Sequence, residues 1–220
     1  MLVKTLTAAL QGIDAVLITV EANLTSMLGR FDIVGLPDNA VRESEQRVRS
    51  ALSVNGFHIS AKGVVINMAP ADIKKEGAGF DLAIAVAWLA ANESVLTRRL
   101  QDFLLMGELS LDGSLQPVRG VLPIAVSARQ NGYRGVIVPE QNAAEAAVVS
   151  GLEVYGMNNL RDVVQFLNGE IEREPLQIDI NRIFMEGQAQ SVLDFAEVRG
   201  QQNVKRALEV AAAGGHNILM

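Results

Sequence analysis

The longest uninterrupted apolar stretch of the chain is LAIAVAWLAA, which covers Leu82 to Ala91. A helix that is apolar on every side has to be surrounded by protein or by lipid. The stretch is only half as long as the roughly 20 residues that a membrane span requires, so we expect a helix in the centre of a protein core. A chain of 220 residues, of which 49% are apolar, is long enough to build that core.

Strand and helix patterns alternate between residues 103 and 169. The first is a hairpin over 103–117, where Asp112-Gly113 separates two alternating runs and favours a tight turn. Such alternation is typical of an α/β domain. The segments after the hairpin are a helix over 120–132, a strand over 135–139, a helix over 142–150, a strand over 152–157 and a helix over 159–169.

Two strand regions are predicted in the first third of the chain. Residues 15–36 contain two β-rich apolar runs separated by a polar stretch that ends in Gly29, which predicts a strand pair. A buried strand is predicted over 61–69, and Pro70 stops it.

A helix is expected between these strand regions. It begins after Pro37, at Asp38 or Asn39, and Asn55-Gly56 ends it. Glu43 and Arg47 are four residues apart, so we expect them to pair on the outer face of this helix.

The chain is expected to contain one domain and the beginning of another. The α/β domain covers 1–170, a charged segment with poor periodicity over 171–190 is the linker, and a new element starts around Ser191 in the region 191–220. Gly214-Gly215 ends a helix, and residues 216–220 resemble the first residues of a buried strand. Because so short a strand cannot stand alone, either the tail folds back or the natural protein continues. The buried face of that helix is marked by Val204, Ala207, Leu208 and Ala211.

Composition and charge exclude several classes of function. The chain has no cysteine, which excludes disulfides, thiolate metal sites and thiol nucleophiles and favours a reducing cytoplasm. Its first residues lack the layout of a signal peptide. The net charge of −6 argues against strong non-specific binding of nucleic acid by this chain alone, although a local basic patch stays compatible with it.

Catalytic and metal-binding patterns are missing. His58 and His216 lie far apart without cysteines to join them, so we expect both to be structural and predict no metal site. There is no G-x-x-x-x-G-K-[ST] phosphate loop and no G-x-S-x-G turn. We therefore expect no ATP hydrolysis by this chain alone, no catalytic residue and no cofactor.

One loop has unusual chemistry. Lys74 and Lys75 precede Gly77-Ala78-Gly79, which opens the apolar helix, so exposed amides, close backbone approach and two cations could form an anion site. The other interpretation is that the glycines permit a tight turn and the lysines are solvated. Asp81 in the first helical turn favours the helix dipole and needs no functional role. Arg119 could supply a second anion contact or be solvated.

Four ordered segments carry a family resemblance. They are FDIVGLPDNAVRESEQRVRSAL, INMAPADIKKEGAGFDLAIA, GELSLDGSLQPVRGVLPIA and DFAEVRGQQNVKRALEVAAAGGHNILM. Together they resemble the magnesium-chelatase-like AAA+ ATPases of the YifB/ComM family over essentially the whole chain. The resemblance implies a Lon-protease-like, ribosomal-protein-like α/β domain with a mixed sheet and packed helices. It also implies the first helix and strand of an AAA+ module, cut one strand before the Walker A loop.

The resemblance also implies ligands and missing chemistry. The full-length protein would bind ATP and Mg²⁺ and form a homo-oligomer, a hexamer, with Val198, Gly200 and Gln201 beside the nucleotide base. Lon proteases use a serine and a lysine, and the matching places hold Gly77 or Ala78 and Leu122 or its neighbours. Without a hydroxyl or an amine there is no nucleophile, so we expect no peptidase activity.

The expected function concerns DNA. ComM-type relatives resemble hexameric helicases that drive branch migration in recombination and natural transformation. This segment would then assist ring assembly and contact DNA. Two alternatives are a purely structural oligomerisation domain and the ATPase subunit of a metal chelatase. The residues expected to contact phosphates are Lys74, Lys75, Arg119, Arg42 and Arg49, with Gly77 and Gly79 supplying backbone approach.

Overall fold

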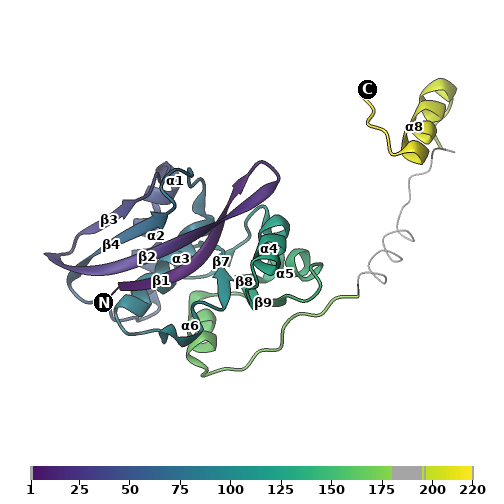
Figure 1. Cartoon of the computed structure of the whole chain (residues 1–220). Helices are drawn as coiled ribbons and strands as arrows, with labels where there is room; N and C mark the ends of the chain where they lie inside the picture. The colour runs from purple at the N-terminus through teal and green to yellow at the C-terminus, as the bar shows by residue number, and fades with distance from the viewer. Residues whose placement is uncertain (1, 180–194, 196, 220) are drawn as a thin grey trace. The chain divides into compact units, whose positions relative to one another are not determined.

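The computed structural model describes residues 2–179, 195 and 197–219, and the chain divides into two compact units (Figure 1). The first unit covers Met1–Ile178 and the second covers Asp179–Met220. No helix in the described part of the chain is both long enough and apolar enough to cross a membrane.

A mixed sheet of seven strands forms the centre of the first unit, in the order β3-β4-β2-β1-β5-β8-β9. β1 pairs antiparallel with β2 and β2 pairs antiparallel with β4, whereas the other neighbours are parallel. The strands are β1 (Leu2–Gln11), β2 (Asp14–Leu28), β3 (Phe31–Val34), β4 (Lys62–Ala69), β5 (Phe103–Leu105), β8 (Gly135–Pro139) and β9 (Glu153–Met157), with a separate small ladder of β6 (Glu108–Leu109) and β7 (Leu115–Gln116).

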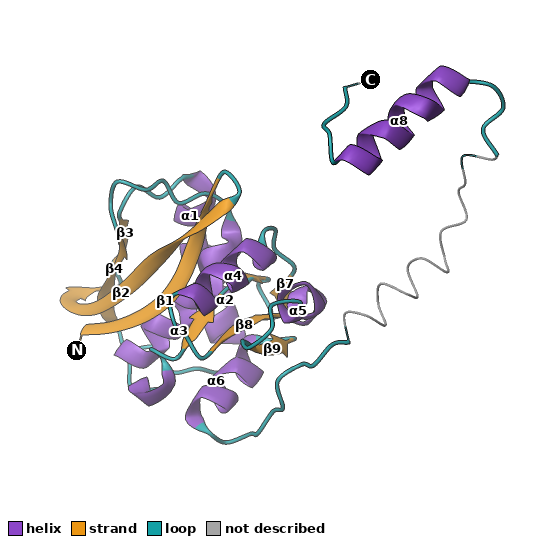
Figure 2. Ribbon diagram, turned by 45° about the vertical axis from the view of Figure 1, so that its right-hand side comes forward, coloured by secondary structure: helices purple, strands orange, loops and turns teal. Residues whose placement is uncertain are grey.

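Helices cover both faces of this sheet (Figure 2). α2, α3 and α6 belong to one apolar core, and α4 and α5 belong to the other. The helices are α1 (Asn39–Arg42), α2 (Ser44–Val54), α3 (Asp81–Ala91), α4 (Val121–Gln130), α5 (Glu140–Ala147), α6 (Leu160–Asn168) and, in the second unit, α8 (Gln202–Gly214), with short 3₁₀ turns η1 (Ala78–Phe80) and η2 (Thr97–Arg99).

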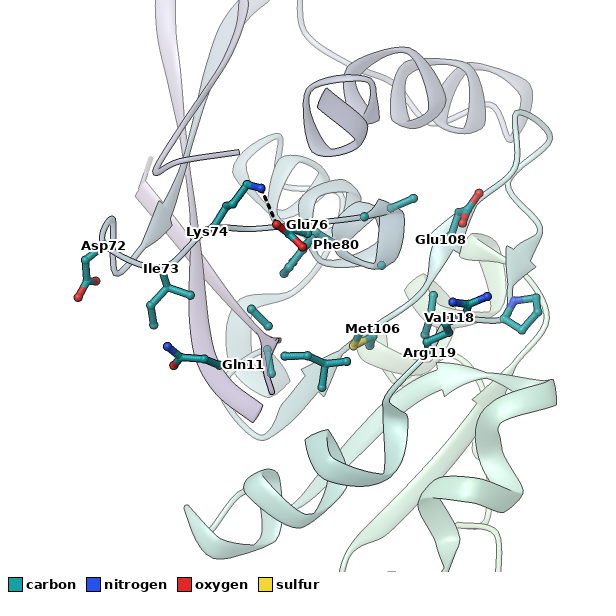
Figure 3. A pocket seen from close by; sticks show the side chains of 17 residues that line it. Gln11, Asp72, Ile73, Lys74, Glu76, Phe80, Met106, Glu108, Val118 and Arg119 are labelled. Atoms are coloured by element: carbon teal, nitrogen blue, oxygen red, sulfur yellow. Dashed lines mark ion pairs between the residues drawn. The ribbon is translucent and has the colours of Figure 1, made fainter. Parts of the chain in front are cut away.

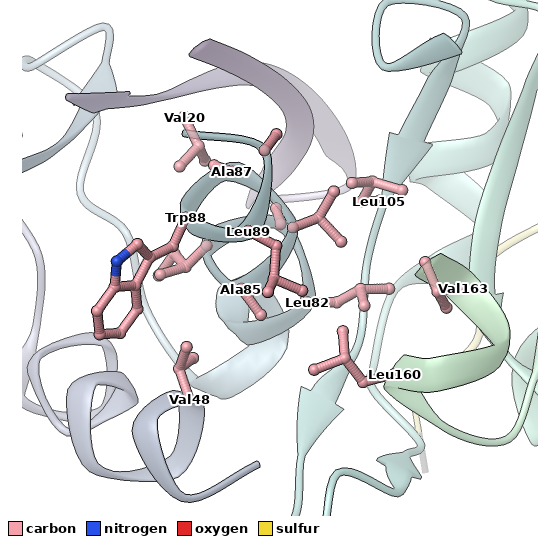
Figure 4. Close-up of a cluster of buried hydrophobic side chains, with 14 of the residues drawn as sticks. Val20, Val48, Leu82, Ala85, Ala87, Trp88, Leu89, Leu105, Leu160 and Val163 are labelled. Carbon is pink, nitrogen blue, oxygen red and sulfur yellow. The ribbon is translucent and has the colours of Figure 1, made fainter. Parts of the chain in front are cut away.

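α3 is the helix predicted from the apolar run, and it lies in the middle of the larger core. All of its residues from Asp81 to Ala91 are buried. Val20, Val48 and Leu160, which come from the sheet, α2 and α6, surround it (Figure 4). The prediction of a central core helix is confirmed.

Strand alternation divides the side chains of β1 between the two cores. Val3 and Ala9 belong to the core that contains α3, whereas Leu6 and Ala8 belong to the core that contains α4. This is the period of two that a strand covered on both faces requires. β1 therefore lies in the interior of the domain.

The helix and strand alternation predicted after residue 117 is confirmed by α4, β8, α5, β9 and α6. The Asp112-Gly113 turn joins β6 and β7, so the predicted hairpin exists as a short ladder. The first residues of the predicted hairpin, Phe103–Leu105, form β5 and join the main sheet instead, because β8 lies parallel beside them.

Two predictions in the first third of the chain need correction. β2 and β3 are both present, but they are not partners, because β4 lies between them and pairs with each. The single helix expected after Pro37 is two helices, α1 and α2, which meet at Glu43. Asp38 caps the first of them as predicted, since its carboxylate accepts a hydrogen bond from the Val41 amide at 2.8 Å.

Residues 171–178, which were expected to be linker, belong to the first unit. The amide of Leu176 donates to the carbonyl of Val154 at 2.8 Å, and Arg173 pairs with Asp162 at 2.9 Å. We call this extended segment the strap. Its hydrogen bond to β9 explains why the first unit continues beyond 170.

In the second unit, α8 matches the predicted helix. Gly215 follows it in the left-handed conformation, at φ 61°, as expected for a helix C-terminus. Residues 216–219 do not form the expected strand, because no neighbouring strand is present among the described residues. The element expected to start around Ser191 lies outside the described residues.

Candidate binding cleft

A cleft of about 870 Å³ lies beside the loop that precedes α3 (Figure 3). Four segments line it: the end of β1 (8–11), the loop 72–80, residues 106–108 and residues 117–119. The structure brings Lys74, Gly77, Gly79 and Arg119 together in this cleft.

Asp38 holds the loop in place. Its backbone amide donates to the Lys75 carbonyl at 2.9 Å, and its side chain accepts from the Gly77 amide at 3.1 Å. The Gly77 amide, which was expected to be open to an external anion, is therefore already bonded to a carboxylate of the protein. This pairing weakens the predicted anion site.

Lys75 differs from the expectation of a surface cation. The residue is fully buried, and its ammonium group donates to the carbonyl of Pro70. Lys74, its neighbour, is exposed and forms an ion pair with Glu76 at 2.5 Å. Lys75 cannot contact a phosphate on the surface, so its assignment as a DNA contact was wrong.

Burial gives Lys75 a measurable effect on stability. Desolvation lowers the pKa of its ammonium group, against a smaller opposite effect of Asp72. Between that lowered pKa and the unfolded value of about 10.4, the unfolded chain binds a proton that the folded chain lacks, so the free energy of unfolding rises with pH.

We expect the free energy of unfolding of the wild type to rise relative to that of Lys75→Met as the pH rises toward about 10.4. Burial raises the pKa of Tyr155 to about 12, which lowers the free energy of unfolding at high pH. Tyr155 is present in both proteins, so its contribution cancels when the two free energies are subtracted. Urea denaturation at a series of alkaline pH values measures it. A difference independent of pH would show that Lys75 is not desolvated.

The charges in the cleft are mixed rather than basic. Asp72, Glu76 and Glu108 line it together with Lys74 and Arg119. Since Lys74 and Glu76 are paired with each other, two carboxylates face one guanidinium. The cleft as a whole does not favour a polyanion.

The two other predicted cations lie on the helices around α3. Arg49 donates to Glu45 at 2.9 Å and to the Gly29 carbonyl at 3.0 Å, and its guanidinium lies over the Trp88 ring at 5.0 Å. It therefore has an internal structural role. Arg42 is exposed at the end of α1, outside the cleft.

The sequence patterns did not predict a buried polar network around Asp81. The fully buried carboxylate of Asp81 accepts hydrogen bonds from the Ser44 hydroxyl, from Arg47 at 2.6 Å and 3.0 Å, and from the Leu109 amide at 3.2 Å. The hydrogen bonds between Arg47 and Asp81 raise the pKa of the Arg47 guanidinium. Asp81 thus joins α2, α3 and β6, beyond its effect on the helix dipole.

Arg47 was expected to pair with Glu43 on the outer face of one helix. That contact exists but is long, at 3.9 Å, and the shorter contacts of Arg47 are to Asp81. The available signal was Ser44, which lies about one helical turn before Arg47 on the same face of the helix. A polar pair on a buried face needs a buried partner.

The backbone at Gly77 is unsuited to a serine nucleophile. Its φ of 82° and ψ of 174° lie in a region that essentially only glycine adopts. Leu122, one of the positions that the Lon resemblance matches to the catalytic lysine, does not line this cleft but borders a smaller hollow beside Ile13. Gly77 and Leu122 therefore line different hollows.

We expect the double variant Gly77→Ser/Leu122→Lys to cleave casein no faster than the wild type. A serine at 77 would strain the loop, and a lysine at 122 would face the other hollow. A fluorescent casein assay checks this, with folding confirmed by circular dichroism. Cleavage that copurifies with the folded variant would contradict the separation of the two positions.

The residues expected to border a nucleotide base lie in the second unit. Val198, Gly200 and Gln201 are exposed on the turn before α8, and Gln201 precedes the helix in a left-handed conformation at φ 57°. The Lys205 ammonium group donates to the Val198 carbonyl.

Among the described residues, no group of three or more His, Asp or Glu side chains could hold a metal ion. His58 and His216 are both exposed.

The family comparisons match two parts of the chain. Residues 20–142 match the family described as subunit ChlI of Mg-chelatase. Residues 194–220 match a second family description, magnesium chelatase, subunit ChlI.

Individual relatives extend over nearly the whole chain. Competence protein ComM of Haemophilus influenzae is 43% identical over 96% of this chain and 41% of its own length. The uncharacterized protein YifB of Salmonella typhimurium is 40% identical over 97% of the chain and 41% of its own length. The chain thus spans about two fifths of the length of these curated relatives.

A more distant similarity concerns the fold. Lon protease 2 of Bacillus subtilis is 28% identical over 142 residues, which are 63% of this chain and 25% of the protease. The mixed α/β architecture together with this similarity makes the first unit a Lon-like domain. The chain belongs to the family of Mg-chelatase subunit ChlI and is a member of its YifB/ComM type.

Proposed function

We propose that this chain is the N-terminal part of a ComM-type ATPase that acts on DNA, as a branch-migration helicase in recombination or natural transformation. The observation that carries the proposal is the 43% identity to a competence protein over 96% of the chain. ATP and Mg²⁺ would bind in the longer protein, with Val198, Gly200 and Gln201 contributing to the base side of that site. The first unit contributes no catalytic group of its own.

We assign two roles to the first unit within that protein: assembly of the ring, which we expect to be a hexamer in the cytoplasm, and contact with DNA. Three of the five predicted cations are exposed and can meet phosphates, namely Arg42, Lys74 and Arg119. Lys75 is buried, and Arg49 is bonded within the protein. The DNA contact therefore depends on few charges and should be weak and sensitive to salt.

The test is the salt dependence of DNA binding by the chain at low ionic strength. If the three cations contact phosphates, changing Arg42, Lys74 and Arg119 together to glutamate lowers the affinity and reduces the log-log salt slope by about 2–3, since each contact contributes about 0.9. An unchanged slope would contradict the assigned contacts.

A matched control changes the same amount of charge elsewhere. Lys4, Arg30 and Arg134 have side chains that are 50%, 58% and 51% exposed and that already pair with carboxylates. Changing these three to glutamate is expected to weaken DNA binding through net charge but to alter the slope less than the first variant does. Equal slopes for both variants would mean that only the net charge matters.

A structural role in oligomerisation alone is the second candidate. It is favoured by the internal use of Lys75 and Arg49 and by the carboxylates of the cleft, which leave few cations for DNA. It predicts that replacing the three cations in the longer protein leaves both ring formation and DNA binding unaffected. A metal-chelatase ATPase is the third candidate, and it predicts ATP turnover that responds to a porphyrin.

A further inference from the structure

β1 has one edge that is paired along its whole length and one edge that is not. It pairs with β2 from Leu2–Asn23 to Gln11–Asp14. On its other side it pairs with β5 only at Leu6–Leu104. Beyond that pair, residues 8–11 have no strand beside them within the described parts of the chain, and this is where they line the cleft.

The hydrogen-bonding groups of this free edge can be assigned. A two-residue turn closes on Gln11 and Asp14, so the odd-numbered residues of β1 bond to β2. In agreement, the carbonyl of Lys4 faces the other side and accepts from the Gln101 side chain at 3.1 Å. The amide and carbonyl groups of Ala8 and Leu10 therefore point away from β2.

No described residue provides a hydrogen-bond partner for those groups of Ala8 and Leu10. Ala8 is buried and Leu10 is 44% exposed, so the edge opens progressively toward the hairpin tip. Unpaired backbone groups on an edge are a template for another strand, and unpaired groups that are also buried are rare in folded proteins. This sheet already accepts an extended segment at β9, where the strap bonds to Val154.

The walls of the cleft indicate which segment fits. Phe80, Met106 and Val118 supply apolar surface. Gly79 has no side chain to fill the cleft, and a Cβ there would lie 3.0 Å from the Met106 methyl carbon. The carboxylates of Asp72 and Glu108 have no ion-pair partner among the described side chains, and both line the cleft. With Asp72 and Glu108 outside any ion pair and Arg119 as the guanidinium beside them, the apolar surface of the cleft fits apolar and basic side chains better than phosphates.

We propose that the cleft binds an extended polypeptide segment with apolar side chains and lysine or arginine, which adds as a strand to the free edge of β1 at Ala8–Gln11. Backbone hydrogen bonds to Leu10 and Ala8 supply the affinity, and Asp72 and Glu108 supply the preference for basic residues. The segment is held without being cleaved. This proposal does not depend on DNA contact, since it uses the strand edge and the carboxylates rather than the cations.

Amide hydrogen exchange measured by NMR on the full 220-residue chain tests the proposal. The probe is a peptide of about eight residues that alternates valine and lysine, long enough to span the four edge residues at about 3.3 Å each. Binding is expected to slow exchange at Leu10, which is exposed, and to leave Ala9 and Gln11, which already bond to β2, unchanged. Protection that ignores this alternation, or no binding at all, would overturn strand addition.

Two further probes define the ligand class. A peptide with glutamate in place of lysine is expected to bind at least about tenfold more weakly, and a peptide with proline at alternate positions should not bind, because it cannot form the ladder. Single-stranded oligothymidylate of similar length should not protect Leu10. Protection by the oligonucleotide and not by the peptide would assign the cleft to nucleic acid instead.

Two variants test the site by different means. Ala78→Trp, which places a large side chain in the cleft, is expected to abolish peptide binding, whereas Ala144→Trp on the exposed side of α5 should not. Asp72→Asn/Glu108→Gln keeps the shape and should remove the preference for lysine over glutamate. Unaltered affinity in the folded Ala78→Trp variant, or an unaltered preference in the amide variant, would contradict the proposal.

Discussion

Replacing Arg47 by methionine is expected to lower the free energy of unfolding of the first unit by about 3–5 kcal/mol, because it leaves a buried carboxylate without its cation. Asp81 is fully buried, and Arg47 makes two of its hydrogen bonds, at 2.6 Å and 3.0 Å. Methionine retains much of the volume of arginine, so lost packing contributes little. The only tryptophan of the chain, Trp88, lies in this unit and reports its unfolding in urea through fluorescence.

A control and a rescue separate the charge effect from general damage. Arg30→Met removes an exposed ion pair with Asp32, in which the side chain of Arg30 is 58% exposed. This change should lower the free energy of unfolding by less than about 1 kcal/mol. Adding Asp81→Asn to Arg47→Met should recover part of the loss, because no unpaired charge is then buried. If the double variant is less stable than Arg47→Met alone, the uncompensated carboxylate is not the cause.

Gly35→Ala should also destabilise the first unit, by at least about 3 kcal/mol, since it adds a steric clash to backbone strain. Gly35 has a φ of 104°, and a Cβ there would lie 2.1 Å from the Met68 carbonyl oxygen. That oxygen belongs to β4, which is paired on both sides with β2 and β3 and cannot move aside. Urea denaturation followed by Trp88 fluorescence measures the loss.

Gly12→Ala is the matched control for Gly35→Ala. Gly12 also has a positive φ, of 65°, but no heavy atom lies within 4 Å of a Cβ placed there. Its substitution should lower the free energy of unfolding by only about 1–2 kcal/mol, which is the strain of placing alanine in the left-handed conformation. Equal losses for the two variants would show that the approach to Met68 is not a constraint.

Local patterns predicted much of the fold. α3 could be predicted because a run of apolar residues of helical length must be buried, whatever surrounds it. The alternation from α4 to α6 could be predicted because each segment carries its own period and its own turn residues. Neither inference needs to know which elements are neighbours.

The order of the strands could not be predicted in the same way. β3 lies beside β4 rather than β2, and β1 between β2 and β5, because side chains far apart in sequence share one core. β1 was not predicted as a strand at all. Its residues alternate between two apolar cores instead of between core and solvent, so the pattern of one buried face is absent.

The sequence singled out the residues of the cleft but not their environments. It offered the Gly77–Gly79 loop as an anion site and Arg119 as a second anion contact or a solvated residue, and the structure places them in one cleft. The opposite environments of the adjacent residues Lys74 and Lys75 depend on the turn at Pro70 and on Asp38, which no local period reveals. The partners of Asp81 likewise come from α2 and β6.

ATP turnover by the longer protein, measured with and without branched DNA, tests the proposed function most directly. We predict that branched DNA raises the rate and that changing Arg42, Lys74 and Arg119 to glutamate reduces this stimulation while leaving the rate without DNA unaltered. Turnover that ignores DNA, or that responds instead to a porphyrin and Mg²⁺, would contradict it.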